Sequence, residues 1–199
     1  MKFSIRLFSI FIFLFALKNI SAQNFDTRML LAANSFHTPS LDNFMMTATQ
    51  SNSFICTAIP ASLMIYGKLS RDKDTWHNGL KMGTSILAAE GVTYVLKNII
   101  KRPRPFDTNI QGLRNLITPT DYSMPSGHAS TSFALCASIC FAYPLQWKYI
   151  LPSAAFTSLI CYSRMYIGVH YPSDILAGIL VGTAMSLATS VFYKKVYGF

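Results

Sequence analysis

The sequence predicts an all-α fold, a transmembrane helical bundle of about five spans that forms a single domain. Two features of composition support this class. Of the 199 residues, 51% are hydrophobic and only 13% are charged, whereas soluble domains carry about 25% charged residues, and the mean hydropathy is +0.33. A third observation is that the apolar residues gather in five segments, which polar or basic stretches separate.

These five apolar segments give the expected spans. They cover residues 54–66 (extending towards 51), 82–96, 129–143, 149–162 and 175–193. Most are shorter than the roughly 20 residues that cross a bilayer, but Ser, Thr and Gly flank them, and transmembrane helices accept these residues. A soluble bundle of very apolar helices is the alternative. The length of the fifth segment argues against it.

The amino terminus has the pattern of a targeting segment. Lys2 and Arg6 precede a short apolar stretch, and Ala22 offers a small residue at a cleavage point. We therefore predict a signal peptide at residues 1–22 and one membrane domain at residues 23–199. If the segment is an uncleaved signal anchor instead, it adds a sixth span without changing the topology that follows.

A polar stretch separates this segment from the first span. Residues 28–32 show a short helical pattern, which can lie along the membrane surface. Residues 39–42 are typical of a turn that leads into the next helix, with Ser40 as its cap.

The net charge is +9, and the basic residues follow the topology that an exported amino terminus imposes. The turns expected in the cytoplasm are basic, as the positive-inside rule requires: they hold Lys68, Arg71, Lys73, Lys81, Lys148, Lys194 and Lys195. One outer loop breaks the rule, with Lys97, Lys101, Arg102, Arg104 and Arg114. Phosphate binding would explain this exception, so we expect phosphate-bearing membrane lipids as partners and no nucleic acid.

Three polar clusters fall at this same outer face. Two of them precede the third span, and the last lies between the fourth and fifth spans. In order, they are Lys97 with Arg104-Pro105, then Pro125-Ser126-Gly127-His128, then Ser163-Arg164 with His170 and Asp174. The predicted topology brings all three together.

The residue types in these clusters suit a phosphate group. Lys97, Arg104 and Arg164 can surround phosphate oxygens, and arginine offers two-pronged contacts. Gly127 lets the backbone approach closely. Ser126 can cap the third helix, whose free N–H groups would face the anion. Phosphoryl transfer needs mainly this kind of positioning and charge stabilisation.

The two histidines can divide the remaining chemistry. Asp174, four residues after His170, can orient that ring, so we assign His170 as the nucleophile. His128 can then protonate the departing alkoxide, and water would hydrolyse the phosphohistidine. The assignment depends on the carboxylate, because spacing alone leaves the two roles interchangeable.

These residues resemble the signature of the type 2 phosphatidic acid phosphatase (PAP2) family, which shares its site with bacterial class A acid phosphatases and vanadium haloperoxidases. The resemblance covers residues 26–192 in outline. It implies a helical bundle and a histidine mechanism without a metal ion or cofactor. Every signature position is matched: Lys97, Arg104, Pro105, Pro125, Ser126, Gly127, His128, Ser163, Arg164, His170 and Asp174. The phosphate contacts it implies come from Lys97, Arg104, Ser126, Gly127, His128 and Arg164.

The resemblance implies a lipid phosphate phosphatase. Together with the topology given above, it leads us to expect a bacterial inner-membrane protein whose site faces the periplasm. Relatives act on phosphatidate, phosphatidylglycerol phosphate, polyprenyl diphosphate or lipid A, and the motifs do not choose among these. One alternative is an acid phosphatase for soluble esters, or a vanadate haloperoxidase, against which the apolar spans argue. Another is a non-catalytic membrane protein that binds lipid phosphates. Binding alone would not need His128, His170 and Asp174.

Three further charged residues carry weaker hypotheses. Glu90 lies seven positions before Lys97 inside an apolar segment. It either pairs with a basic residue near the site or packs through hydrogen bonds. Lys101 and Arg102 either meet a diphosphate or lipid headgroup or are solvated.

Overall fold

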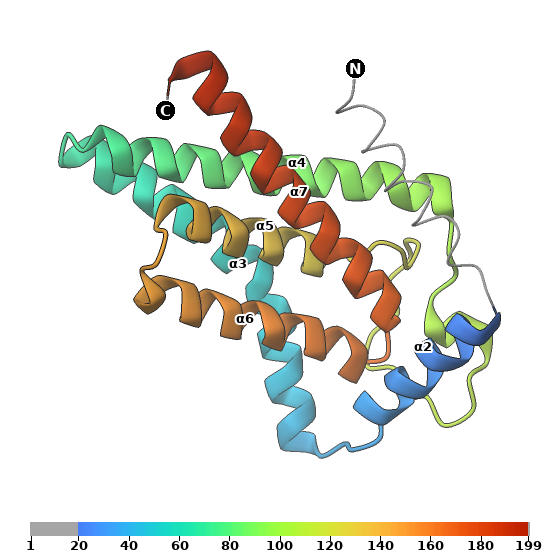
Figure 1. Cartoon of the computed structure of the whole chain (residues 1–199). Helices are drawn as coiled ribbons and strands as arrows, with labels where there is room; N and C mark the ends of the chain where they lie inside the picture. The colour runs from blue at the N-terminus through green and yellow to red at the C-terminus, as the bar shows by residue number, and fades with distance from the viewer. Residues whose placement is uncertain (1–19, 199) are drawn as a thin grey trace.

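The computed structural model describes residues 20–198, and every regular element in that range is helical (Figure 1). The elements are α2 (Ile20–Ala33), α3 (Pro39–Leu69), α4 (Lys73–Ile100), the 3-10 turn η1 (Pro105–Thr108), α5 (Gly127–Ala142), α6 (Trp147–Tyr166) and α7 (Pro172–Tyr197). The all-α prediction is confirmed, and the five expected segments correspond to α3 to α7. Most of the predicted signal peptide, residues 1–19, lies outside the described residues.

The helices extend beyond the apolar segments, most of all at the start of α3. The predicted turn at residues 39–42 is wrong, because these residues form the first turn of α3. Thr38 is the N-cap in place of Ser40, and its Oγ1 accepts a hydrogen bond from Leu41 N at 3.2 Å. Pro39 follows at the first helical position, where its fixed φ and missing N–H are tolerated.

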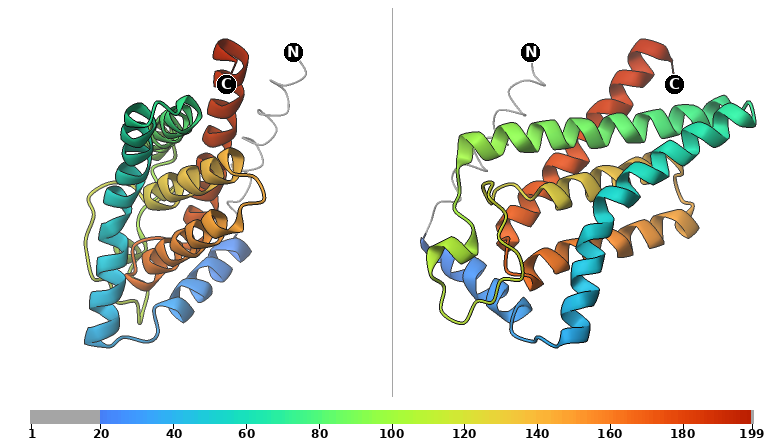
Figure 2. Two further views of the ribbon diagram at one scale, coloured as in Figure 1. Left: turned by 90° about the vertical axis from the view of Figure 1, so that its left-hand side faces the viewer. Right: turned by 180° about the vertical axis from the view of Figure 1, so that it is seen from behind.

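The connections divide between two ends of the bundle. In Figure 1 the short turns from α3 to α4 and from α5 to α6 lie on the left. The loop of residues 101–126, the connection of residues 167–171 and helix α2 lie at the other end, as the reverse view in Figure 2 also shows. Helix α2 contacts α6 and α7 there.

Helix α5 is central and packs on α3, α4, α6 and α7. Small residues bring it very close to α7. A Cβ added at Gly178 would lie 2.6 Å from Ser126 O and 2.9 Å from Ala129 Cβ. Further along the same contact, Ser138 Oγ and Ser186 Oγ share a hydrogen bond of 2.8 Å. Close approach through small residues is common between membrane helices. Here it places the start of α5 beside the start of α7.

The helices expose much apolar surface. Large apolar side chains face outward on α3, α4 and α7, among them Phe54, Leu87, Tyr94, Leu180 and Leu187. Extensive exposed apolar surface marks contact with a membrane or a partner. Within residues 20–198, α7 alone has both the length and the apolar composition to cross a membrane, and α5 is a shorter apolar helix. The count of five spans therefore stays a prediction.

Candidate active site

The three polar clusters meet at the end of the bundle where α4 ends and where α5 and α7 begin. The second and third clusters are joined by the main chain, because Ser126 N donates to Asp174 O at 2.9 Å. The first and third are joined through Arg104, whose Nη1 donates to Val169 O at 2.9 Å. The juxtaposition expected from topology is present in the structure.

His170 lies in the connection before α7, and only 2% of its surface is exposed. Its Nδ1 is 3.5 Å from Oδ2 of the fully buried Asp174. The same Oδ2 accepts hydrogen bonds from Ser123 Oγ at 2.5 Å and from Tyr171 N at 2.9 Å. The carboxylate is thus fixed on the Nδ1 side of the imidazole, and Nε2 lies on the opposite edge of the ring.

The protonation of His170 follows from this environment. Burial lowers the pKa of His170 to about 3; Asp174 opposes this effect, and Arg164 and Arg104 reinforce it. The imidazole is therefore neutral near pH 7. With Asp174 beside Nδ1, we assign the ring proton to Nδ1, so that Nε2 carries the free lone pair. Nε2 lies 3.3 Å from Arg104 Nη1.

Lys97 and Arg104 both bind the carboxylate of Asp121, in the 101–126 loop. Lys97 Nζ lies 2.9 Å from Oδ2, and Arg104 Nη2 lies 2.5 Å from Oδ1. Lys97 Nζ also donates to Tyr122 O. Partial burial raises the pKa of Asp121, but the hydrogen bonds and charges of Lys97 and Arg104 outweigh it and lower the pKa to about 2. Two cations predicted to hold phosphate thus hold a carboxylate of the chain itself.

Two buried polar atoms of the site, Ser126 Oγ and Arg164 Nε, have no hydrogen-bond partner among the described residues. Arg164 is anchored by Nη1, which donates to Thr49 Oγ1 at 2.7 Å. Ser126 is the N-cap residue of α5, but its hydroxyl makes no capping bond, so the predicted side-chain cap is wrong. Buried polar atoms without partners are rare in native proteins. Both atoms can donate, so an acceptor such as a phosphate oxygen would satisfy either one.

The remaining two predicted residues open helix α5. A Cβ at Gly127 would meet only Thr93 Cγ2, at 3.9 Å, so the main chain here is not tightly covered. His128 follows in the first turn, and electrostatic interactions link it to Arg164, His170 and Arg104. Both histidines therefore belong to one charged site at one end of the bundle.

Arg102 is the main site residue whose contacts could not be predicted from the sequence. It is neither solvated nor directed at a headgroup: its Nη1 lies 2.7 Å from Asp174 Oδ1, and its Nη2 lies 2.9 Å from Asp26 Oδ2. Ser123, which contacts Asp174, was missed as well. No local pattern identifies these pairs, because Asp26 and Asp174 lie 76 and 72 residues from Arg102 in sequence. The only sequence signal was the run of basic residues in the loop.

The other two weak hypotheses concern exposed residues. Lys101 is exposed, as the solvated alternative predicts. It ends α4 in a left-handed conformation with φ of 52°. Glu90 is also exposed, on the surface of α4. Within residues 20–198 it forms no ion pair with a basic residue of the site, so that proposed pairing is wrong.

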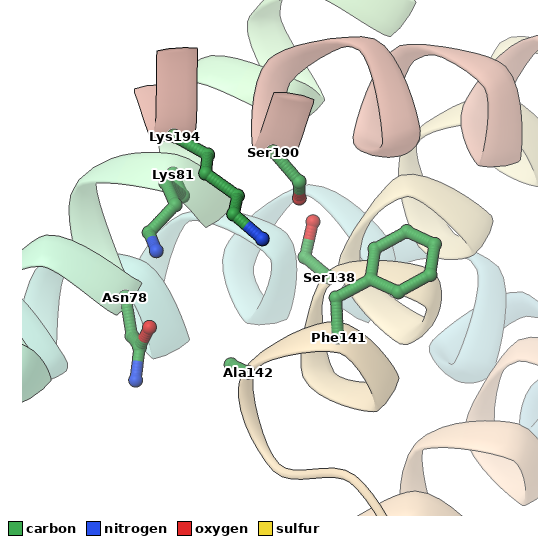
Figure 3. Close-up of a pocket in the computed structure, with 7 residues that line it drawn as sticks. All are labelled: Asn78, Lys81, Ser138, Phe141, Ala142, Ser190 and Lys194. Atoms are coloured by element: carbon green, nitrogen blue, oxygen red, sulfur yellow. The ribbon is translucent and has the colours of Figure 1, made fainter. Parts of the chain in front are cut away.

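Two cavities among the described residues lie away from this site. One of about 320 Å³ is formed by the start of α4 and the ends of α5 and α7, where Lys81, Ser138 and Lys194 line it (Figure 3). Another, of about 430 Å³, is apolar and is lined by residues including Ile55 and Leu135. The buried polar cluster, and not cavity size, identifies the candidate site. Among the described residues, no group of three or more His, Cys, Asp and Glu side chains is placed to hold a metal ion.

Comparison with known families gives independent evidence. The PAP2 superfamily matches residues 78–197, which include all three polar clusters. The chain belongs to the PAP2 superfamily. The resemblance inferred from the signature residues is thereby confirmed.

Several characterised proteins are similar to this PAP2 chain. It is 33% identical over 135 residues to an undecaprenyl-diphosphatase of Sulfolobus acidocaldarius, covering 67% of this chain and 61% of that protein. It is 28% identical over 121 residues to a lipid A 1-phosphatase of Rhizobium etli, covering 59% of this chain and 51% of that protein. The PAP2 chain thus spans less than two thirds of the length of these curated relatives.

Solved structures show the same fold along nearly the whole PAP2 chain. A transmembrane PAP2 type phosphatidylglycerolphosphate phosphatase from Bacillus subtilis superposes with a TM-score of 0.76 and 26% identity, covering 98% of both chains. LpxE of Aquifex aeolicus gives a TM-score of 0.62 at 21% identity, covering 82% of this chain and 93% of that one. The fold of the PAP2 chain is therefore that of a membrane protein, as its exposed apolar helices suggest.

Proposed function

We propose that this PAP2 chain is a lipid phosphate phosphatase that forms a phosphohistidine at His170. One observation carries the proposal: a buried, neutral His170 is backed by Asp174 and faces Arg104, at the point where two further cations and a second histidine converge. Nucleophile, carboxylate support and cations are the parts that phosphoryl transfer requires.

The phosphoryl group would be held mainly by cations. Lys97 and Arg104 would exchange the Asp121 carboxylate for phosphate oxygens, which have the same charge sign and a similar acceptor geometry. Arg164 Nε and Ser126 Oγ, the two buried donors without partners, would complete the set. The N–H groups at the start of α5, beginning with Gly127, add a favourable dipole.

The reaction then follows from the arrangement of the two histidines. His170 Nε2 forms a bond to phosphorus while the bond from phosphorus to the ester oxygen breaks. The leaving oxygen takes a proton from His128, and Asp174 stabilises the positive imidazole. In the second step water attacks phosphorus and gives a proton back to His128. The P–N bond breaks, its electron pair returns to Nε2, and phosphate leaves.

A lipid substrate fits the position of the site in the fold. The site lies at one end of helices whose sides expose apolar residues, so a headgroup could reach it while its tail stays in the bilayer. Similar proteins are named as phosphatases of undecaprenyl diphosphate, lipid A and phosphatidylglycerolphosphate. We therefore propose a lipid phosphomonoester or diphosphate as the substrate class.

Phosphate release from purified protein in lipid nanodiscs tests this function. The panel contains phosphatidate, phosphatidylglycerol phosphate, undecaprenyl diphosphate and the soluble ester p-nitrophenyl phosphate. We expect turnover of at least one lipid, inhibition by vanadate and full activity in EDTA. His170→Ala should abolish both turnover and acid-labile labelling from a ³²P-substrate. His77→Gln, which alters a histidine in α4 near the opposite end, is the control.

Each alternative has its own outcome in this assay. Turnover of the soluble ester alone, or oxidation of bromide by peroxide after loading with vanadate, would replace the lipid phosphatase with a soluble-substrate enzyme. Saturable lipid phosphate binding without turnover would indicate a non-catalytic binder. Normal turnover by His170→Ala would show that the nucleophile is assigned wrongly.

We propose further that the protein lies in a bacterial inner membrane with this site facing the periplasm. The basic turns at the other end of the bundle, which contain Lys68, Arg71 and Lys73, support this orientation. A cysteine replacing the exposed Gln111 in the 101–126 loop should react in intact cells with an impermeant thiol reagent. A cysteine replacing the exposed Asp74 should react only after lysis. The reverse pattern would invert the orientation.

A further inference from the structure

Helix α2 lies outside the residues matched by the PAP2 superfamily, yet it contacts the site. We propose that α2 is part of the catalytic apparatus, with Asp26 and Arg102 as positioning residues that orient the Asp174 carboxylate and, through it, the His170 ring. The catalytic half of this inference rests on the proposed function.

The first observation is that both oxygens of Asp174 are engaged. Oδ2 faces Ser123, Tyr171 N and His170, as described above, while Oδ1 accepts from Arg102 Nη1 at 2.7 Å. A carboxylate bonded on both oxygens cannot rotate freely, so Arg102 fixes which oxygen faces the imidazole. Without Arg102, one oxygen of a fully buried carboxylate would lose its partner.

Arg102 is itself held in place, and Asp26 of α2 is its main support. Asp26 Oδ2 accepts from Arg102 Nη2 at 2.9 Å, and Asp26 Oδ1 accepts from Ser173 N at 3.0 Å. Ser173 Oγ donates to Asp26 Oδ2 and accepts from Arg102 Nη1. The guanidinium also lies over the Tyr171 ring, 4.0 Å from its centroid. Asp26 therefore joins α2 to the first turn of α7 and to the loop after α4.

The far end of α2 is anchored to the same region. The side chain of Asn34, just after the helix, donates from Nδ2 to Arg114 O at 2.7 Å and to Tyr166 O at 2.5 Å, and it accepts from Arg114 N at 2.9 Å. Helix α2 is thus tied to the segments that carry the site at two points, at its middle through Asp26 and just past its C-terminal end through Asn34, and the position of Asp26 is fixed.

The charges of this network match the proposed chemistry. Asp26 and Asp174 share the single guanidinium of Arg102, so the three groups together carry one negative charge. That charge balances the positive imidazole that forms when His170 is phosphorylated. Both terminal nitrogens of Arg102 bond to carboxylates, so we assign to Arg102 a positioning role and not a phosphate contact.

The test compares Arg102→Gln and Asp26→Asn in the full chain, in nanodiscs. We expect kcat to fall by about 10- to 100-fold in each, the size of effect that a misplaced catalytic group produces. KM and the inhibition constant of inorganic phosphate should stay near the parent values, because the phosphate-binding cations are untouched. The double variant should be no worse than the poorer single variant, since both substitutions break one chain of contacts. Arg102→Lys should recover part of kcat.

Two matched controls remove charge nearby without entering the network. Arg28→Gln alters an exposed residue of the same helix, whose hydrogen bond among the described residues goes to Asn24 O of that helix at 3.3 Å. Lys101→Gln alters the exposed neighbour of Arg102. Both should keep the parental kcat. Losses of the same size in the controls would overturn the proposal, as would parental kcat in Asp26→Asn or a rise in the inhibition constant of inorganic phosphate that matches the fall in kcat.

A measurement without turnover separates this inference from the proposed function. In ¹⁵N NMR of histidine-labelled protein, the parent His170 should show Nδ1 protonated and Nε2 bare, and Arg102→Gln and Asp26→Asn should each shift this signal. Unchanged spectra in both folded variants would overturn the positioning role. If the parent released no phosphate from any lipid, the proposed function would fail, while the NMR comparison would still decide the role of α2.

Discussion

The carboxylate of Asp121 occupies the two cations that we propose bind phosphate, so it should compete with substrate. The substitution Asp121→Asn keeps the shape of the side chain and removes its charge. Lys97 and Arg104 would then no longer be neutralised by the 101–126 loop. We expect tighter binding of phosphate-like anions, the opposite of what loss of a substrate-binding residue produces.

The pKa of Asp121 gives the magnitude of this competition. A change from 3.8 to about 2 corresponds to about 2.4 kcal/mol in favour of the ionised carboxylate, at about 1.36 kcal/mol per unit. The side chain is 56% exposed, and solvent screening reduces this to about 1 kcal/mol. An incoming phosphate must displace the carboxylate, so its removal should tighten binding about five-fold.

The assay is vanadate inhibition of lipid phosphate turnover at low ionic strength. Asp121→Asn should lower both the inhibition constant and KM by about five-fold, and added salt should shrink the difference. Asp74→Asn removes an exposed carboxylate near the opposite end and should change neither. If vanadate bound Asp121→Asn no better than the parent protein, Asp121 would not be a competitor, and the loop contact would be purely structural.

Three further predictions follow from the geometry. In Gly178→Ala the new Cβ would lie 2.6 Å from Ser126 O, which forces α5 and α7 apart and lowers the free energy of unfolding by about 1–3 kcal/mol. Thermal unfolding should show this loss, whereas Gly91→Ala, which has open space around it inside α4, should be at least as stable as the parent. The pKa of His170 is about 3, so its ring should stay neutral as the pH falls from 8 to 5 and should protonate only near pH 3; an ¹⁵N titration midpoint near 6.5 would contradict this. Lys97→Gln should lower kcat/KM by about 100-fold through lost charge stabilisation, while Lys101→Gln stays near the parent; equal losses in the two would mean that only net charge matters.

Much of the fold could be predicted because it depends on local patterns. Apolar runs identified all five long helices, since a helix that faces lipid or core is apolar over most of its length. The residues at which the helices begin and end were harder to predict from the sequence. The first fourteen or so residues of α3, from Pro39 on, contain many polar side chains, so the apolar run began well after the helix did. Thr38 takes the cap because Pro39 fits only just inside a helix start.

The residues of the candidate site also fall into two groups, those that could be predicted from the sequence and those that could not. Lys97, Arg104, His128, His170 and Asp174 could be predicted as candidate site residues because phosphoryl transfer requires those residue types, and the structure brings them to one end of the bundle. Asp26, Arg102 and Asp121 could not, because their roles come from ion pairs between distant or irregular segments. A basic residue in a loop has the same appearance in sequence whether it is solvated or bonded to a buried carboxylate. Only the packing of α2 and of the 101–126 loop shows whether a basic residue here is solvated or bonded to a carboxylate.

The bond from Ser126 N to Asp174 O joins main chain to main chain. Nearly any exchange of side chains preserves it, since only proline at position 126 would remove the donor. The spacing between the segments that carry His128 and His170 is therefore set by a main-chain hydrogen bond and not by side chains. Residues on the outer helix faces can therefore change without moving these two segments apart. For the lipid phosphatase that we propose, this means that the lipid-facing surface and the proposed reacting groups can change separately.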